Sequence, residues 1–264
     1  MTEIIYPELS YTVQGAFYDI YNELRYLDLS EEGWESALLI SLEERGVPVR
    51  RQVEYELRYK GYRIGRFFVD VLADEKLLLE LKVEDKLLPI DMAQVITYLK
   101  VADLKLGILV NFGDELEFRR IPNFASQRST SRPPANVIQS SNHLLHPELT
   151  GELRAVLYEV HGELGSGFMH MHYRRATQIE LRRHDIPYEV KKEMTVRFRG
   201  RPIETRETRL LIVDRQVLLA PIAVHGITPR LKGRFRQYLR LLGLDLGLIA
   251  NFHTPSLEIE TVRI

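Results

Sequence analysis

The sequence predicts an α/β protein of two tandem domains, each with a mixed central sheet flanked by helices. One observation is a repeat: "WESALLISLEERGVPVRRQVEYELRYKG" (34–61) resembles "YRRATQIELRRHDIPYEVKKEMTVRFRG" (173–200), and "YLKVADLKLGILVNF" (98–112) resembles "YLRLLGLDLGLIANF" (238–252). The offsets are 139 and 140 residues, so one inserted residue separates the copies. The other observation is that helical and strand periodicities follow each other in the same order in both copies.

The repeat also predicts the domain boundaries. Residues 123–146 precede the second copy and are rich in Ser, Pro and Asn without a periodic apolar pattern, which is typical of a linker. We therefore expect domains at 1–122 and 147–264, each of ordinary domain size.

Each copy begins with an amphipathic helix and a second helix. The apolar stripe of the first helix consists of Val13, Phe17, Tyr21 and Leu24 in copy one, and of Leu153, Leu157, Val160 and Leu164 in copy two. Alternating apolar residues then predict a strand at 53–59, followed by a turn at "KGYRIG". Two further strands within 65–86, a helix at 89–102 and a strand at 104–112 complete the unit.

Composition limits the classes of protein. The 264 residues are 45% hydrophobic, and no apolar run reaches the roughly 18 residues that span a bilayer. The N-terminus lacks the pattern of a signal peptide, and the absence of cysteine excludes disulfides and thiolate metal sites. We expect a globular, cytoplasmic protein with no membrane partner; the oligomeric state stays open.

The charge is divided unevenly. Residues 1–125 hold 15 basic and 23 acidic residues, whereas residues 126–264 hold 21 basic and 14 acidic ones, for a total of −1. The two halves therefore have opposite net charge.

Three charged residues stand inside apolar, strand-like runs: Asp70, Glu80 and Lys82. Burying a charge costs several kcal/mol unless something compensates. Because side chains alternate along a strand, Glu80 and Lys82 lie side by side on one face, opposite Leu79 and Leu81. One interpretation is an exposed Glu–Lys ladder; the other is a functional site.

These residues carry a resemblance. Asp70, ten residues before Glu80-Leu81-Lys82 and followed by Gln94-Val95-Ile96-Thr97-Tyr98, resembles the motif of the PD-(D/E)XK (restriction-endonuclease-like) nucleases, including the Q-x-x-x-Y helix of some members. Both copies are also similar to the GxxExxY family of that superfamily. Copy two has Gly167 and Tyr173 but His170 in place of the glutamate, and copy one has Glu31 but Asp28 and Trp34 at the other two positions.

The resemblance implies a metal-dependent nuclease with Mg²⁺ as cofactor, for which Mn²⁺ substitutes. Asp70, Glu80 and the carbonyl of Leu81 would hold the ion, and Lys82 would orient or activate water and stabilise the transition state. Glu31 would approach the metal or its water, while Gln94 and Tyr98 would position Lys82 or a phosphate. Glu31 has an alternative interpretation as part of a helix cap begun by Ser30.

Copy two lacks these charges. Ala220 stands for Glu80, Ile222 for Lys82, Arg234 for Gln94, and either Arg209 or Leu210 for Asp70. Its helix at 228–240 instead carries the cations predicted to bind nucleic acid: Arg230, Lys232, Arg234 and Arg236. The alternative is that these cations dock against the acidic first half.

Three function classes follow. The first is a metal-dependent nuclease, with DNA favoured as the partner, whose N-terminal copy is catalytic and whose C-terminal copy binds substrate or is structural. The second is a non-catalytic nucleic-acid-binding or assembly module of the same fold. The third is another carboxylate enzyme, such as a glycosidase that uses Asp70 and Glu80; Lys82 and the repeated nuclease-like fold argue against it.

Overall fold

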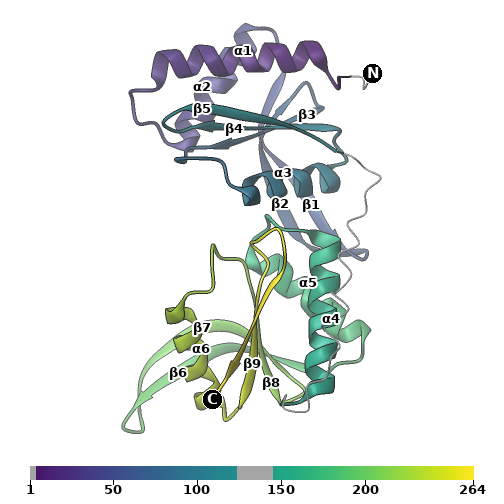
Figure 1. Cartoon of the computed structure of the whole chain (residues 1–264), viewed down its shortest axis with the longest axis vertical. Coiled ribbons are helices and arrows are strands. Elements are labelled where there is room, and N and C mark those ends of the chain that lie inside the picture. The colour runs from purple at the N-terminus through teal and green to yellow at the C-terminus, as the bar shows by residue number, and fades with distance from the viewer. Residues whose placement is uncertain (1–3, 124–144) are drawn as a thin grey trace. The chain divides into compact units, whose positions relative to one another are not determined.

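A computed structural model describes residues 4–123 and 145–264. The chain divides into two compact units, one on each side of residues 124–144, and each unit has one five-stranded mixed sheet with helices on both faces (Figure 1). The predicted α/β class and the tandem arrangement are thus confirmed. Residues 124–144, which make up most of the predicted linker, lie outside the described residues.

The N-terminal unit follows the predicted order of elements. Its helices are α1 (Pro7–Leu24), α2 (Glu31–Glu44) and α3 (Pro89–Ala102). Its strands are β1 (Val49–Tyr59), β2 (Tyr62–Ala73), β3 (Leu77–Lys82), β4 (Leu106–Phe112) and β5 (Leu116–Pro122). They form a sheet in chain order in which β3 and β4 are parallel and the other neighbours antiparallel.

The C-terminal unit repeats this arrangement. Its helices are α4 (Pro147–Leu164), α5 (His170–Arg183) and α6 (Pro229–Leu242). Its strands are β6 (Tyr188–Phe198), β7 (Arg201–Val213), β8 (Val217–Ile222), β9 (Leu246–Asn251) and β10 (Glu258–Arg263), with β8 and β9 parallel. The edge strands β5 and β10 were not predicted, because their short sequences mix polar and apolar residues and carry a weak strand pattern.

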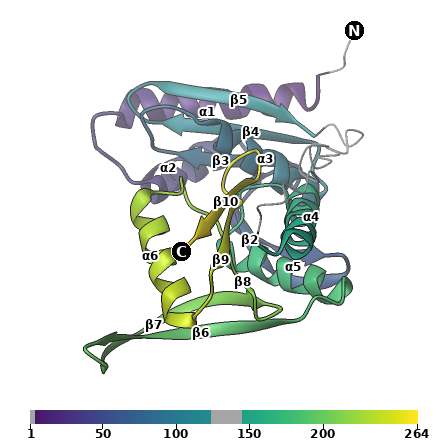
Figure 2. The ribbon, with the colours of Figure 1, turned by 60° about the horizontal axis from the view of Figure 1, so that its bottom comes forward.

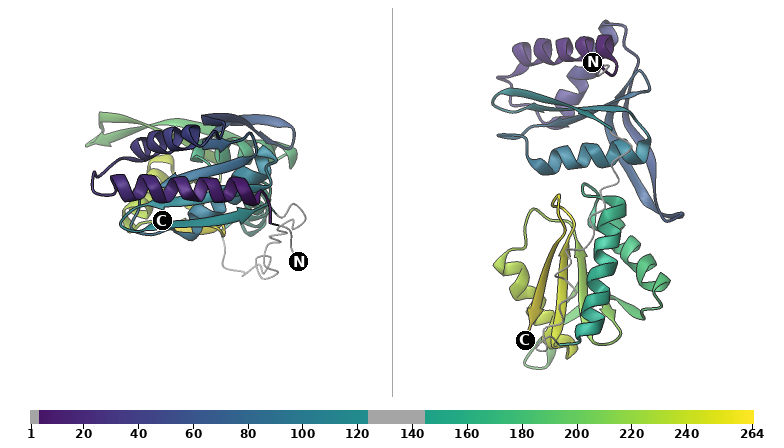
Figure 3. Two further views of the ribbon diagram at one scale, coloured as in Figure 1. Left: turned by 90° about the horizontal axis from the view of Figure 1, so that it is seen from above. Right: turned by 45° about the vertical axis from the view of Figure 1, so that its right-hand side comes forward.

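Each sheet separates its helices into two layers. Leu77, Leu79 and Leu81 of β3 pack into a core with α1 and α2, and α3 covers the opposite face (Figures 1 and 3). Figure 3 also shows α4 and α5 on one side of the second sheet and α6 on the other. The face that carries Glu80 and Lys82 is therefore the face covered by α3.

Matching contacts hold corresponding elements together in the two units. Trp34 stacks on Phe112 with ring centroids 4.5 Å apart, and Tyr173 stacks on Phe252 at 4.4 Å. Asn111 brackets the backbone of Glu84, as Asn251 brackets that of Val224. The aromatic pairs hold the start of α2 and of α5 against the sheet. The asparagines hold the segment that follows the central strand, β3 or β8.

A long hairpin leaves each sheet. Strand β2 pairs with β3 only over Val71–Ala73, so most of the β1–β2 ribbon has no third strand beside it. The β6–β7 ribbon is built in the same way and extends beyond the rest of its unit (Figure 2). Asp70 precedes the first of these β2–β3 pairs, at the point where the ribbon joins the sheet.

The structure also locates the inserted residue. Val71 is paired with Leu79, and Leu211 with Leu219, so Leu210 is the counterpart of Asp70. The extra residue is accommodated by a register shift in the β6–β7 ribbon, where Arg209 has a left-handed φ of 60°. The open choice between Arg209 and Leu210 is thereby decided for Leu210.

None of the helices within the described residues is long and apolar enough to cross a membrane.

Candidate functional site

Glu80 lies on the central strand β3 and is only 2% exposed. Its Oε1 accepts hydrogen bonds from Nζ of Lys82 at 3.0 Å and from Nε2 of Gln94 at 2.8 Å. The side chain is therefore buried between its own strand and α3. An exposed Glu–Lys ladder does not describe this pair.

The second carboxyl oxygen of Glu80 is unsatisfied. Its Oε2 is buried and has no hydrogen-bond partner among the described residues. Burial, together with the neighbouring Asp70 carboxylate, raises the pKa of Glu80 from 4.5 to about 8. A buried, partnerless carboxyl oxygen of this kind indicates a position where a proton or a cation is bound.

Asp70 occupies the next position in the β2–β3 register, opposite Glu80. Its Oδ2 accepts the backbone N–H of Leu81 at 3.0 Å, and its Oδ1 accepts a long bond from Gln52 at 3.4 Å. The first of these bonds fixes the Asp70 carboxylate against the strand that carries Glu80. The pairing of β2 with β3 therefore places the Asp70 and Glu80 carboxylates next to each other, where the β1–β2 hairpin joins the sheet.

Lys82 connects the carboxylates. Its Nζ lies 3.0 Å from Oε1 of Glu80 and 3.9 Å from Oε1 of Glu31. Burial alone would lower the pKa of Lys82, but the carboxylates of Glu80, Glu31 and Asp70 outweigh it and raise the pKa above its ordinary value. Lys82 therefore remains a cation at neutral pH.

Gln94 and Tyr98 lie one turn apart on α3 and face the site. Nε2 of Gln94 donates to Glu80 and also to the hydroxyl of Tyr98 at 3.0 Å. Tyr98 packs against Phe67 of β2, with ring centroids 4.6 Å apart, and burial raises the pKa of its hydroxyl. Gln94 thus contacts Glu80 directly, and Tyr98 is joined to it through Gln94. The implied role of both residues in positioning Lys82 or a phosphate stays a prediction.

Glu31 is the first residue of α2, and it lies both in the capped helix start and near the candidate site. Oγ of Ser30 accepts the N–H of Gly33 at 3.3 Å and caps the helix. The Glu31 carboxylate meanwhile lies near Lys82, and partial burial raises its pKa, opposed by Lys82 and reinforced by Asp70. Glu31 therefore stands at the more exposed side of the site.

Sequence reasoning missed Glu35, which lies one turn after Glu31 and is 5% exposed. Its carboxylate forms an ion pair with Arg51 at 2.7 Å and accepts a hydrogen bond from Gln52 at 3.0 Å. Because Gln52 also reaches Asp70, it bridges the two acids. The i, i+4 spacing from Glu31 was the signal that could have identified Glu35.

The residues present fit a hard divalent cation. Carboxylate oxygens are the ligands that Mg²⁺ and Mn²⁺ prefer, and Asp70 and Glu80 supply them beside an unsatisfied buried oxygen. The carbonyl of Leu81 stays a predicted third ligand. Within residues 4–123 and 145–264, no group of three or more His, Asp or Glu side chains forms a ready metal cluster. An ion here would therefore depend on two carboxylates together with backbone or water ligands.

Comparison with known proteins decides the family. One family model, described as the PD-(D/E)XK nuclease superfamily, matches residues 7–121 and again residues 147–264. This chain belongs to the PD-(D/E)XK nuclease superfamily. The closer similarity to the GxxExxY family stays a prediction.

Curated proteins and solved structures give no further information on the function of this PD-(D/E)XK protein. No curated protein matches the chain. Among solved structures, one described as "Crystal structure of SSO0001" shares 21% identity at a TM-score of 0.29, and the match covers 45% of this chain and 57% of that one. The chain thus spans a little over half the length of that structure.

The second PD-(D/E)XK copy has lost the site as a unit. Leu210, Ala220 and Ile222 replace Asp70, Glu80 and Lys82. Residue 221, the counterpart of Leu81, is a proline, which has no N–H to donate. Copy two has therefore lost both partners of the hydrogen bond that joins Leu81 N–H to Asp70 in copy one. This joint loss is expected if the N–H at this position served only to hold the carboxylate.

The structure divides the four cations predicted to bind nucleic acid. Arg230 and Arg234 lie one turn apart on one flank of α6, while Lys232 and Arg236 lie on the other. Nζ of Lys232 pairs with Glu260 of β10 at 2.8 Å, within the same unit. The three arginines are exposed. No single surface therefore contains all four.

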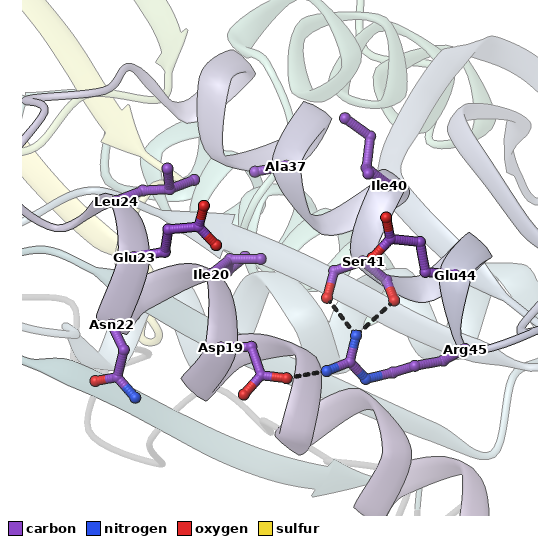
Figure 4. A pocket seen from close by; sticks show the side chains of 10 residues that line it. All are labelled: Asp19, Ile20, Asn22, Glu23, Leu24, Ala37, Ile40, Ser41, Glu44 and Arg45. Carbon is purple, nitrogen blue, oxygen red and sulfur yellow. Dashed lines mark hydrogen bonds and ion pairs between the residues drawn. The ribbon is translucent and has the colours of Figure 1, made fainter.

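A separate pocket of about 820 Å³ lies between α1 and α2 (Figure 4). Arg45 spans it, bonding to Ser41 and pairing with Asp19. None of its lining residues belongs to the predicted site, so we assign it no part in the chemistry.

In the metal-free protein, thermal stability is expected to fall as the pH rises from about 5 to about 8. The folded protein binds the Glu80 proton more tightly than the unfolded chain, whose carboxyl has a pKa of 4.5. Stability from this proton is complete below pH 4.5 and is lost as the pH approaches 8, by at most about 1.4 kcal/mol per pH unit. Melting curves with a chelator should show this slope in the wild type and a weaker one in Glu80→Gln. Parallel pH profiles would contradict the raised pKa.

Proposed function

We propose that this chain is a divalent-metal-dependent nuclease that hydrolyses phosphodiester bonds, with its catalytic site in the N-terminal copy. The observation that supports this most strongly is the buried Glu80 carboxyl, whose Oε2 has no partner among the described residues although Lys82 and Gln94 bind Oε1. We also propose the domain limits 1–122 and 147–264.

In this proposal Asp70 and Glu80 bind Mg²⁺ or Mn²⁺ together with the carbonyl of Leu81. The bound ion supplies Lewis-acid stabilisation of the phosphoryl oxygens and a more acidic water. Lys82, which its carboxylate neighbours keep charged, contributes positive charge to the transition state and orients the attacking water. Gln94 and Tyr98 hold Glu80 and a substrate phosphate in place.

Cleavage of labelled nucleic acid by the whole chain tests this function. Single- and double-stranded DNA and RNA are incubated with Mg²⁺, with Mn²⁺ and with a chelator. We expect metal-dependent cleavage, with DNA preferred. A chain that binds Mn²⁺ in a calorimeter but cleaves none of the four substrates would overturn the catalytic assignment.

A non-catalytic module that binds nucleic acid is the second candidate. It is favoured by the lack of a group of three or more potential metal-ligating side chains within the described residues, and by Lys82 and Gln94 both occupying Oε1 of Glu80. Binding without cleavage, unaffected by Glu80→Gln, is the result that would support it.

We further propose that α6 contributes to nucleic-acid affinity. Replacing Arg230 and Arg234 with Ala should weaken binding to all sequences and flatten its salt dependence by about 0.7–0.9 in log–log slope for each phosphate that the variant no longer neutralises. The double variant of Lys232 and Arg236 is the matched comparison on the other flank. Because Lys232 pairs with Glu260, that variant should mainly lower the melting temperature. Unchanged salt slopes in both variants would assign α6 to a structural role.

A further inference from the structure

A pocket of about 340 Å³ occupies, in the C-terminal unit, the position of the candidate active site in the N-terminal unit. His170 and Arg174 of α5 line one side of it, and Arg209 of β7 and Ala220 of β8 line another. The pocket therefore opens at the end of β8, the counterpart of strand β3 that carries Glu80 in copy one.

Its charge is the reverse of that in copy one. At the offset of 139 residues, His170 stands for Glu31 and Arg174 for Glu35. Arg209 lies at the register shift of β7, next to the counterpart of Asp70. Three nitrogen-bearing side chains thus replace a cluster of carboxylates.

Arg174 is buried without a compensating acid. It is 9% exposed and has no ion pair or hydrogen bond among the described residues. In copy one, Glu35 pairs with Arg51. The counterpart of Arg51 is Val190, which is not an acid, so copy two has no reversed ion pair at this position. The guanidinium nitrogens of Arg174 are not among the buried atoms that lack a partner, so they reach the pocket, where an anion can bind them.

The charged groups around Arg174 also favour an anion in the pocket. Burial, Arg209 and Arg175 all lower the pKa of Arg174, and burial, Arg174 and Arg209 lower that of His170. The carboxylate in the lining, Glu207, lies 3.5 Å from Arg209 and is largely exposed. It does not compensate Arg174.

We propose that this pocket binds a phosphate group, held by Arg174 and Arg209 with His170 as a further hydrogen-bond partner. Guanidinium groups form paired, charge-assisted hydrogen bonds with phosphate oxygens. His170 is also the first residue of a 14-residue helix, whose N-terminal N–H groups favour an anion at that end. The second copy has thus exchanged a cation site for an anion site on one scaffold.

This proposal does not rest on cleavage by the N-terminal copy. The binding test uses the whole chain with a chelator, and phosphate binding should persist in Glu80→Gln. A failure of the nuclease proposal would leave that result unchanged.

Titration with inorganic phosphate, at ionic strength kept constant with KCl, tests the pocket. We expect calorimetric binding and a rise in melting temperature that grows with phosphate concentration. Arg174→Met and Arg209→Ala should each weaken binding by roughly 10-fold or more. Without phosphate, Arg174→Met should melt above the wild type, because it removes a partly desolvated cation that Arg209 and Arg175 repel.

Arg206→Ala is the matched control, since Arg206 lies on the same strand, is exposed and pairs with Glu204. It should bind phosphate as the wild type does. If Arg174→Met does not fold, the exposed Arg209 still provides the test. Absence of phosphate binding in the wild type, or equal binding by the wild type and the folded pocket variants, would overturn the proposal.

Competition by oligonucleotides identifies the source of the phosphate. The same oligonucleotide is compared with a 5′-phosphate and with a 5′-hydroxyl. Stronger competition by the phosphorylated form assigns the pocket to a chain end, and equal competition that is lost in Arg174→Met assigns it to the backbone. Phosphate binding without competition by either form assigns it to a free phosphate.

Discussion

Glu80→Gln is expected to lower the rate of metal-dependent cleavage by about 10³-fold, because several kcal/mol of transition-state stabilisation depend on a cation that this carboxylate helps to hold. Glutamine keeps the shape of the side chain and an oxygen that can accept from Lys82 and Gln94. It removes the charge and places an amide among the buried Glu80 contacts. Calorimetric titration with Mn²⁺ and single-turnover cleavage measure the two effects.

Glu54→Gln is the matched control. Glu54 lies on β1 of the same unit, is exposed and pairs with Arg66. Removing its charge should leave Mn²⁺ binding and cleavage unchanged. If Glu80→Gln binds Mn²⁺ as tightly as the wild type, the metal site does not include Glu80.

Lys82→Ala is expected to lower cleavage by about 10²-fold or more while Mn²⁺ affinity changes little. Lys82 bonds to Glu80 and lies near Glu31, so it is placed to act on substrate and water rather than to bind the ion. The loss should appear in kcat more than in KM, because the charge acts on the transition state.

Lys76→Ala provides the comparison for that variant. Lys76 lies in the β2–β3 turn, is partly exposed and pairs with Asp74. It should cleave at the wild-type rate. A Lys82→Ala protein with unchanged turnover would show that Lys82 only compensates the buried Glu80 charge.

Several features of the fold could be read from the sequence because they are local or repeated. Strand alternation placed Glu80 and Lys82 on the face opposite Leu79 and Leu81, and the core contacts of β3 confirm it. The helix predicted at 89–102 is α3 (Pro89–Ala102). The two-fold repeat predicted two similar sheets, which the structure contains.

Other features depend on contacts between distant segments. No local pattern places Glu35 of α2 beside Gln52 of β1 and, through it, Asp70 of β2. The pairing of Lys232 with Glu260 likewise joins α6 to β10 and separates a group of cations that looks continuous in the sequence.

The sequence by itself determined the tandem α/β architecture, the strand face of the charged residues and their absence from copy two, because periodicity and self-similarity are properties of the chain. Only the tertiary structure decided that Leu210 rather than Arg209 replaces Asp70. It alone decided, too, that Oε2 of the buried Glu80 and the side chain of Arg174 have no partner within residues 4–123 and 145–264. Burial and partner choice depend on strand register and helix packing, which bring together residues that are far apart along the chain.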